Sequence, residues 1–310
     1  MVDLTTDAIG FTYFFVPFSS ITVKPHTMYR ILIPTDFSDN AWNAINYATA
    51  LYTGEETVFY LLNSYSPNTI SPGEVMTSSA ATKTLFDAVK SASLEGLEKS
   101  LQEILSSNPD KMHAFRTISR FDYFTNAVVD VCKEERIDMV VMGTTGASGL
   151  KEALVGSNTA SLIGKIGVPL LAIPDEVKFT PLKDIAFATD YNTAYREKNL
   201  NVFFHIADKF SAGIHVYHVL QKKDELTEEN EKSKKEMEKQ FAGHQSEFYL
   251  LTETSLSTAT RVFVQSRNIQ MLCMVAKKHS FLHHLFGLSH TRDMCYHIDI
   301  PLLILQNNAG

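Results

Sequence analysis

Apolar residues in this chain fall into short runs separated by helix-like patterns, and the same order occurs twice. Alternation of strands with helices predicts an α/β fold with two doubly wound, parallel, five-stranded, Rossmann-like sheets. Ser38 precedes the first helical pattern as its expected N-cap. That pattern places apolar residues at helical spacing at Ala41, Ala44, Ile45, Ala48 and Leu51. The expected strands are 29–34, 57–63, 113–119, 137–142 and 168–173, then 184–189, 214–219, 247–253, 269–275 and 300–306.

Two pairs of segments identify the chain as a tandem repeat. Arg30–Ala41 (RILIPTDFSDNA) matches Asp184–Tyr195 (DIAFATDYNTAY) at an offset of 154 residues. Ile137–Gly143 (IDMVVMG) matches Ile269–Val275 (IQMLCMV) at an offset of 132. The first copy therefore holds 22 more residues in its middle. We expect this surplus in Ser66–Lys83, whose Ser, Thr and Pro content is typical of a loop.

The repeat boundaries predict two domains of one kind. The first is expected over 28–175 and the second over 181–310, with the boundary in the proline-flanked stretch Pro174–Pro181. The charge run Gln221–Gln240 in the second domain is expected to be a solvated helix.

The leading residues 1–27 fall outside the repeat. Phe11–Phe18 resembles the apolar part of a signal peptide, but Asp3 and Asp7 precede it and the first basic residue is Lys24. A secretory signal begins with positive charge, so we do not expect one here. The segment is either a strap on the fold or an extension upstream of Met28, and the strong strand after Met28 favours the extension.

Composition narrows the class of protein. The 310 residues suit two domains, and 45% hydrophobic with 20% charged residues excludes global disorder. A net charge of −7 disfavours general nucleic-acid binding, and no apolar run is long enough to span a membrane. The three cysteines, Cys132, Cys273 and Cys295, are too scattered for a disulfide framework, so we expect a reducing, cytoplasmic location.

A glycine constellation follows the fourth strand of the first repeat. Gly143 is followed after two residues by Gly146, then after nine residues by Gly156 and Ser157. Glycines at the carboxyl edge of an open sheet let backbone amides approach phosphates, and Ser157 and Asn158 open the next helix. The alternative is that these glycines only shape a turn and cap a helix. The full spacing, with Thr-Asp on the first strand, favours a nucleotide site.

These motifs resemble the universal stress protein family. The resemblance rests on the glycine spacing, the Pro-Thr-Asp that ends the first strand and the closing Val-Pro-Leu-Leu strand, and it covers Met28 to about Asp175, continuing weakly to Gln306. It implies an adenine nucleotide alpha hydrolase-like fold, ATP as ligand with Mg²⁺ or Mn²⁺ as candidate metals, and dimers formed through the last strands.

The resemblance also implies site residues. The first-strand motif would meet adenine, Met142 and Gly143 the ribose, and the later glycines with Ser157 and Asn158 the phosphates. One departure is that the second strand ends Asn63-Ser64 where the family usually has His-Val, which makes that wall more polar. The implied nucleotide-binding residues are Pro34, Thr35, Asp36, Ser64, Met142, Gly143, Thr144, Gly146, Gly156, Ser157 and Asn158.

The second repeat loses the glycines. Val275, Lys278 and Leu288 stand at the three positions, so we expect one nucleotide per chain, bound in the first repeat. The loop 279–290 is rich in histidines, which more readily fill the vacated pocket or face solvent than bind zinc, because no Cys or carboxylate stands at tight spacing. The apolar residues among them suit a partner or small-ligand contact.

Three functions remain open. The first is an ATP-binding regulatory module of the stress response, and the second is a slow ATPase or self-phosphorylating enzyme. We name no catalytic residue, because a phosphate-binding lysine and a positioned base are missing from the motif, so binding without efficient turnover is favoured. The third is a scaffold that binds a protein partner or apolar ligand through the second repeat. The last strands, Val168–Ile173 and Ile300–Leu305, could pair within the chain as a pseudo-dimer, and a homodimer stays open.

Overall fold

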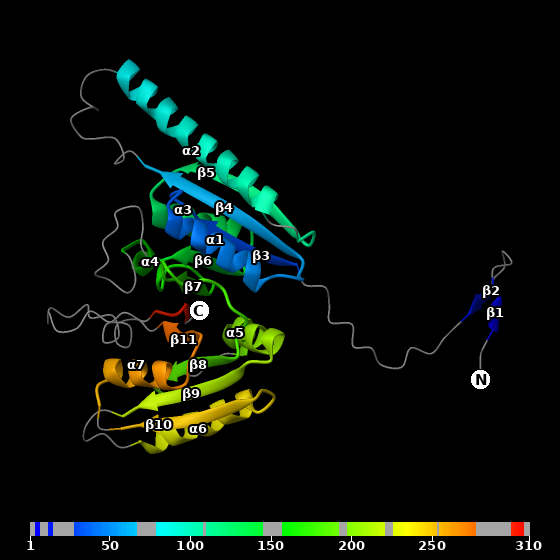
Figure 1. Cartoon of the computed structure of the whole chain (residues 1–310), viewed down its shortest axis with the longest axis vertical. Coiled ribbons are helices and arrows are strands. Elements are labelled where there is room, and N and C mark those ends of the chain that lie inside the picture. Colours follow the sequence, from blue (N-terminus) through cyan, green and yellow to red (C-terminus); the bar gives the residue numbers. More distant parts are fainter. Residues whose placement is uncertain are drawn as a thin grey trace.

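Within the residues that it describes, the computed structural model contains one ten-stranded sheet and a separate two-stranded one (Figure 1). It describes residues 4–6, 12–14, 28–66, 79–107, 110–144, 157–191, 197–220, 226–252, 254–276 and 299–306. The strands are β1 (Leu4–Thr6), β2 (Thr12–Phe14), β3 (Tyr29–Pro34), β4 (Thr57–Tyr65), β5 (His113–Phe121), β6 (Met139–Gly143), β7 (Leu170–Ile173), β8 (Asp184–Thr189), β9 (Gly213–Val219), β10 (Ser246–Leu251), β11 (Met271–Ala276) and β12 (Leu302–Gln306). The helices are α1 (Asp39–Leu51), α2 (Ser79–Ser107), α3 (Phe124–Glu134), α4 (Ser157–Leu162), α5 (Glu197–Phe210), α6 (Glu228–Phe241) and α7 (Leu256–Ser266).

The large sheet consists of two parallel halves joined at their last strands. Its order is β10-β9-β8-β11-β12-β7-β6-β3-β4-β5, and every neighbouring pair is parallel except β12 and β7. These two run antiparallel, with Leu303 opposite Leu171. The predicted α/β class and tandem doubly wound arrangement are confirmed, and the last strands of the two repeats pair within one chain.

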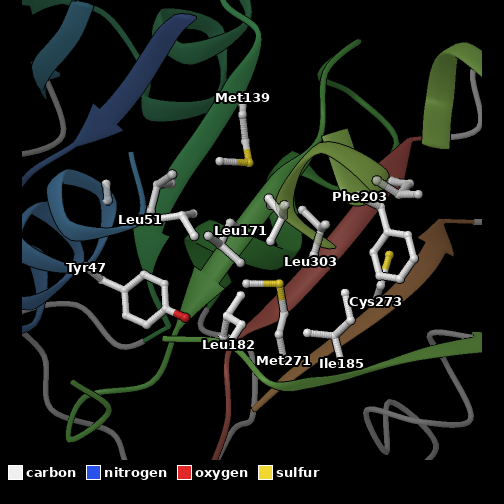
Figure 2. Close-up of a cluster of buried hydrophobic side chains, with 14 of the residues drawn as sticks. Tyr47, Leu51, Met139, Leu171, Leu182, Ile185, Phe203, Met271, Cys273 and Leu303 are labelled. Carbon is white, nitrogen blue, oxygen red and sulfur yellow. The ribbon is translucent and has the colours of Figure 1, made fainter. Parts of the chain in front are cut away.

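Each face of the sheet has one apolar core that crosses this junction. One cluster joins the sheet to α1, α2, α5 and α6, and the other joins it to α3, α4 and α7. Figure 2 shows the first cluster, where Leu171 and Leu303 lie between Met139 of the first repeat and Met271 of the second. All four side chains are fully buried, so the two halves share their hydrophobic stabilisation.

The hydrophobic pattern predicted the strands of the large sheet to within two residues at each end, but it did not predict β1 and β2. Ser38 caps α1 as expected, because its hydroxyl accepts a hydrogen bond from the Ala41 amide at 3.2 Å. The prediction that the extra residues of the first repeat form a loop over Ser66–Lys83 is partly wrong. Residues 79–83 belong to α2, which has 29 residues where its counterpart α6 has 14, so much of the extra length is helix. The fourth helix expected in the second repeat would lie in 277–298, outside the described residues.

The segment that connects the two repeats is held by contacts with helices α1 and α5. The Asn43 amide nitrogen of α1 donates to the carbonyls of Pro174, Asp175 and Val177 at 2.9–3.2 Å. Farther along, the ring of Phe179 packs against Tyr47 of α1 and Phe210 of α5. The predicted boundary stretch therefore connects the repeats as part of the packed structure.

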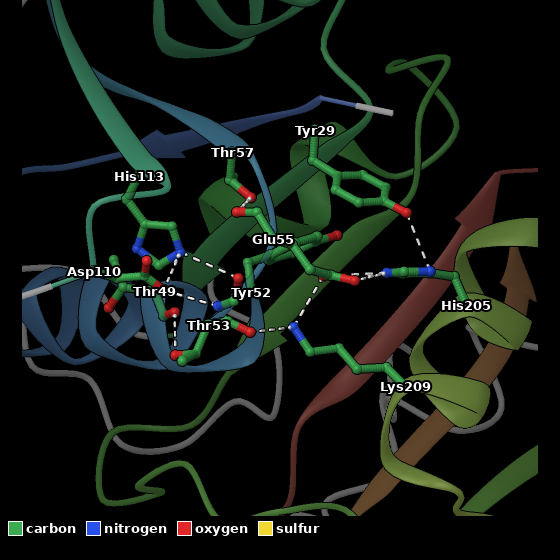
Figure 3. A network of polar contacts seen from close by, with 11 residues as sticks. Tyr29, Thr49, Tyr52, Thr53, Glu55, Thr57, Asp110, His113, His205 and Lys209 are labelled. Atoms are coloured by element: carbon green, nitrogen blue, oxygen red, sulfur yellow. Dashed lines mark hydrogen bonds and ion pairs between the residues drawn. The ribbon is translucent and has the colours of Figure 1, made fainter. Parts of the chain in front are cut away.

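A polar network joins the repeats at one end of α5 (Figure 3). Both ring nitrogens of His205 have polar partners. Nδ1 lies 3.1 Å from the Tyr29 hydroxyl, and Nε2 lies 3.0 Å from Glu55 Oε1. Lys209 Nζ lies 2.9 Å from both Glu55 Oε2 and the Thr53 carbonyl oxygen. Burial, with the nearby carboxylates of Glu55 and Asp138, raises the pKa of Tyr29 to about 12, so this hydroxyl stays protonated.

The leading residues add one small feature. Strands β1 and β2 pair with each other, antiparallel, in a sheet of their own. The choice between a strap and an upstream extension stays a prediction. Among the described residues, no helix is long and apolar enough to cross a membrane.

Candidate functional site

The strand order of the first repeat reverses between β3 and β6. From β3 the chain continues to β4 and β5 on one side, then crosses back to β6 and β7 on the other. The two central strands are parallel neighbours, with Leu32 opposite Val140, so both carboxyl ends reach the same edge. Ligands of open α/β sheets bind at this edge, beside the reversal point.

At the end of β3, Thr35 and Phe37 form a tight turn. The buried Thr35 hydroxyl accepts a hydrogen bond from the Phe37 amide at 3.0 Å, and Phe37 has a positive φ of 65°. The Asn63 amide nitrogen of β4 donates to the Thr35 carbonyl at 2.8 Å. These contacts hold a non-glycine residue in the left-handed region, which otherwise costs about 1 kcal/mol.

The turn presents Asp36 beside the start of α1. The Asp36 carboxylate is exposed and accepts hydrogen bonds from the Ser38 amide at 3.1 Å and the Ser38 hydroxyl at 2.6 Å. The Phe37 ring is 40% exposed and lies on α2 at Gly96, where an added Cβ would come within 2.5 Å of the ring. The carboxylate therefore has a fixed direction, next to an aromatic ring that stays open to solvent.

Gly143 ends β6 against the first turn of α1. A Cβ at Gly143 would lie 2.5 Å from the carboxamide of Asn40, a residue only 7% exposed. The absence of a side chain at Gly143 therefore makes room for the Asn40 carboxamide within the protein, a role that neither the nucleotide interpretation nor the turn-and-cap alternative predicted. Thr144 follows, buried, with its amide donating to the Ile173 carbonyl at 3.0 Å.

The structure describes five of the remaining predicted site residues, and the other two lie outside the described residues. Ser157 and Asn158 lie exposed at the start of α4, and the Thr159 hydroxyl of the same helix donates to the Gly143 carbonyl at 3.3 Å. Ser64 lies on β4, two residues beyond the position opposite the end of β3. Pro34 and Met142 are buried at the ends of β3 and β6, and Gly146 and Gly156 lie outside the described residues.

Two asparagines at this edge were not predicted as functional residues. Asn40 packs on Gly143, and Asn63 fixes the Thr35 turn. Asn63 has a weak sequence signal, because it is a polar residue at the end of an apolar strand. Asn40 has none, since polar residues are common in the first turn of a helix.

Comparison with known proteins identifies the family to which the residues of this candidate site belong. A model of the universal stress protein family matches residues 28–174, which include both strand ends of the site. The first repeat belongs to the universal stress protein family. Two curated universal stress proteins of Methanocaldococcus jannaschii are similar to it. One is 26% identical over 151 residues, covering 46% of this chain and 93% of the relative, and the other is 25% identical over 159 residues, covering 50% and 88%.

Solved structures extend the likeness to both repeats. A universal stress protein from Archaeoglobus fulgidus has a TM-score of 0.62 at 17% identity, covering 89% of this chain and 98% of that one. A functionally unknown protein from Pseudomonas aeruginosa has a TM-score of 0.55 at 11% identity, covering 91% and 93%. At these identities the likeness shows a shared fold.

The second repeat builds the same turn with a buried aromatic residue. The Tyr191 amide donates to the Thr189 hydroxyl at 3.1 Å, and Tyr191 has a φ of 54°. His218 Nδ1 donates to the Thr189 carbonyl at 2.8 Å, as Asn63 does in the first repeat. The Tyr191 ring is 2% exposed, and burial with the nearby Glu238 charge raises its pKa to about 12.

The other chemistry predicted for the second repeat is only partly visible. Val275 is buried on β11 at the position of Gly143. Lys278, Leu288 and the histidine-rich loop 279–290 lie outside the described residues, so the pocket-filling, metal and partner interpretations of this loop stay predictions. In the described part of the chain, no group of three or more His, Cys, Asp or Glu side chains could hold a metal ion. Cys132 and Cys273 are both free, and burial raises both thiol pKa values.

Proposed function

We propose that the first repeat binds one adenine nucleotide, ATP, at the reversal point between β3 and β6, and that the chain acts as a regulatory binding module of the stress response. The observation that carries the proposal is the convergence of the Thr35–Phe37 turn, the end of β6 at Gly143 and the start of α4 at one edge of the sheet. This edge is where open α/β sheets take nucleotides.

The residues present suit the parts of a nucleotide. Asp36 offers an oriented, exposed carboxylate to the amino edge of a base, with Pro34, Thr35 and Ser64 as neighbouring wall. Met142 and Gly143 would border the sugar, as the family resemblance implies, and Thr144 follows them directly after β6. Gly146 and Gly156, with Ser157 and Asn158, would hold the phosphates through backbone amides and short polar side chains.

A metal would accompany the phosphates. The described residues include no cluster of protein ligands for Mg²⁺ or Mn²⁺. Magnesium commonly keeps several waters and binds through substrate phosphates, so this pocket suits a metal carried by the nucleotide.

Binding without efficient turnover is the mode that the described groups favour. Fast phosphoryl transfer uses a cation on the phosphates and a group that orients the nucleophile. Lys165 is nearby in sequence, but it lies after α4, where the chain turns back toward the start of β7 at the opposite edge of the sheet. A slow ATPase stays the alternative, and phosphate release by the pure chain measures it.

Paired carboxylate variants test the proposal. Asp36→Asn removes the charge from the first turn, and Asp190→Asn makes the same change in the second repeat. Calorimetry with ATP and Mg²⁺ should give one site per chain, with affinity reduced about tenfold or more by Asp36→Asn, consistent with loss of a hydrogen bond to a charged group. Asp190→Asn should leave it within about twofold. Two equivalent sites, or equal losses in both variants, would overturn the proposal.

A further inference from the structure

Helix α4 depends on its surroundings for its position. It has six residues, Ser157–Leu162, and a helix this short has little stability of its own. It also begins with Ser157 and Asn158, the residues assigned above to the phosphates. The contacts that fix α4 therefore bear directly on the phosphate side of the proposed site.

Two of these contacts come from the first repeat. The Thr159 hydroxyl, fully buried, donates to the Gly143 carbonyl at the end of β6. The hydroxyls of Ser161 and Thr125 are 2.9 Å apart and join α4 to the start of α3. Both contacts tie the helix to its own half of the sheet.

A third contact comes from the second repeat. Gln306, the last residue of β12, accepts a hydrogen bond from the Gly164 amide at 2.8 Å through Oε1. Gly164 has a φ of +75° in the turn that ends α4, and this turn is closed by the amides of Lys165 and Ile166 donating to the Leu162 carbonyl. Gln306 thus holds the end of the helix whose start faces the site.

The antiparallel junction explains why Gln306 can reach this turn. Gln306 lies opposite Ala276, so it stands at the carboxyl edge of the second repeat. Because β12 runs antiparallel to β7, this edge meets the first repeat where α4 returns into β7 (Figure 1). Gln306 is only 5% exposed, and its Nε2 has no hydrogen-bond partner among the described residues, so the contact with Gly164 is the one that orients it there.

We propose that Gln306 is a positioning residue through which the second repeat pre-organises the phosphate side of the nucleotide site in the first. The proposal rests on the nucleotide binding proposed above. Without the Gln306 contact, the turn after α4 would fluctuate more in the free protein. Binding would then have to order it, and pre-organisation of this kind is a recognised source of affinity.

The test uses the full chain and three variants. Gln306→Met keeps the length of the side chain and removes the acceptor, whereas Gln306→Glu keeps an oxygen for the Gly164 amide. Lys209→Met breaks a different contact between the repeats, the one with Glu55 and Thr53. Lys209 lies on α5, which covers the opposite face of the sheet from α4. The measurements are calorimetry with ATP and Mg²⁺, and hydrogen exchange of the amides in 159–166 without nucleotide.

The expected results separate positioning from general stability. Gln306→Met should speed exchange in 159–166 and weaken ATP binding about fivefold, the equivalent of one ordinary hydrogen bond. Gln306→Glu should stay within about twofold, and Lys209→Met should change neither quantity. Unchanged exchange and affinity in Gln306→Met, or the same loss in Lys209→Met, would overturn the proposal.

Failure of the proposed function gives a different pattern. If the unmodified chain binds no ATP, the function proposed above is wrong and Gln306 pre-organises no nucleotide site. In that event hydrogen exchange still shows whether Gln306 holds α4. Weaker ATP binding in Gln306→Met with unchanged exchange would overturn the positioning mechanism while leaving the nucleotide site in place.

Discussion

The Thr-Asp-aromatic turn is built twice in this chain, and the two copies differ in what covers them. In both, a threonine hydroxyl accepts from the amide two residues later, at 3.0 Å for Phe37 and 3.1 Å for Tyr191. In both, a side chain of the next strand, Asn63 or His218, donates to the threonine carbonyl at 2.8 Å. The aromatic ring is 40% exposed in the first copy and 2% exposed in the second.

The hydrogen-bonded backbone of the turn is therefore independent of how far its aromatic residue is exposed to solvent. Equivalent hydrogen bonds set the backbone of the turn in both repeats, although the neighbouring side chains differ. The exposure of the aromatic ring depends on its neighbours. The Phe37 ring lies on Gly96 of the long α2, whereas the Tyr191 ring packs with His218 near α6. Gly143 against Val275 adds to the contrast at the adjoining strand. A repeat can therefore keep the backbone of this turn while its aromatic residue changes from exposed to buried.

The largest predicted effect contrasts the two rings. Tyr191→Ala should lower the free energy of unfolding by about 3–4 kcal/mol, because it empties a buried aromatic position. Phe37→Ala should cost about 1 kcal/mol or less, since much of that ring is already in water. Urea denaturation of both variants measures the difference. Equal losses would mean that Phe37 is as fully packed in solution as Tyr191, and the comparison would fail.

A second prediction asks whether the repeats unfold together. Leu303→Ala, at the junction opposite Leu171, should cost about 2–4 kcal/mol through lost burial and the cavity left behind. Trp42, the single tryptophan, lies on α1 in the first repeat, so its fluorescence reports that half. The Leu303 variant should shift the fluorescence transition and the circular dichroism transition equally. A Trp42 transition that does not move would show that the halves unfold independently.

A third prediction changes the equivalent residues of the two repeats, Gly143 at the end of β6 and Val275 near the end of β11. Gly143→Val forces the buried Asn40 carboxamide to move, so it should cost about 1–3 kcal/mol and abolish ATP binding. Val275→Ala, its control, should cost about 1 kcal/mol and leave ATP affinity unchanged. Thermal melts and calorimetry supply both values. Retained ATP binding in the Gly143 variant would show that this position does not border the nucleotide.

The sequence predicted the frame of this molecule better than its polar contacts. Strands such as β6 are continuous apolar runs, so their bounds follow from burial on both faces. The surplus was misassigned because Ser and Thr around 79–83 are typical of loops, yet they begin a long helix. The roles of Asn43 and Gln306 were not predictable, because each partner lies more than 130 residues away and single amides have no periodic signal.

The smallest predicted effect concerns the Glu55 network between the repeats. Burial raises the pKa of Glu55, but hydrogen bonds and charge from His205 and Lys209 outweigh it, so the net pKa is lowered. A lowered folded pKa stabilises the protein above the unfolded pKa of about 4.5, and that stability is lost as pH falls through the folded value. Glu55→Gln should therefore cost up to about 1 kcal/mol at pH 7, a modest value because the pair is partly exposed. The difference from the unmodified chain should shrink steadily below pH 4.5, in urea denaturation repeated across pH. A constant difference down to pH 3 would mean that the charge on Glu55 does not hold the two repeats together.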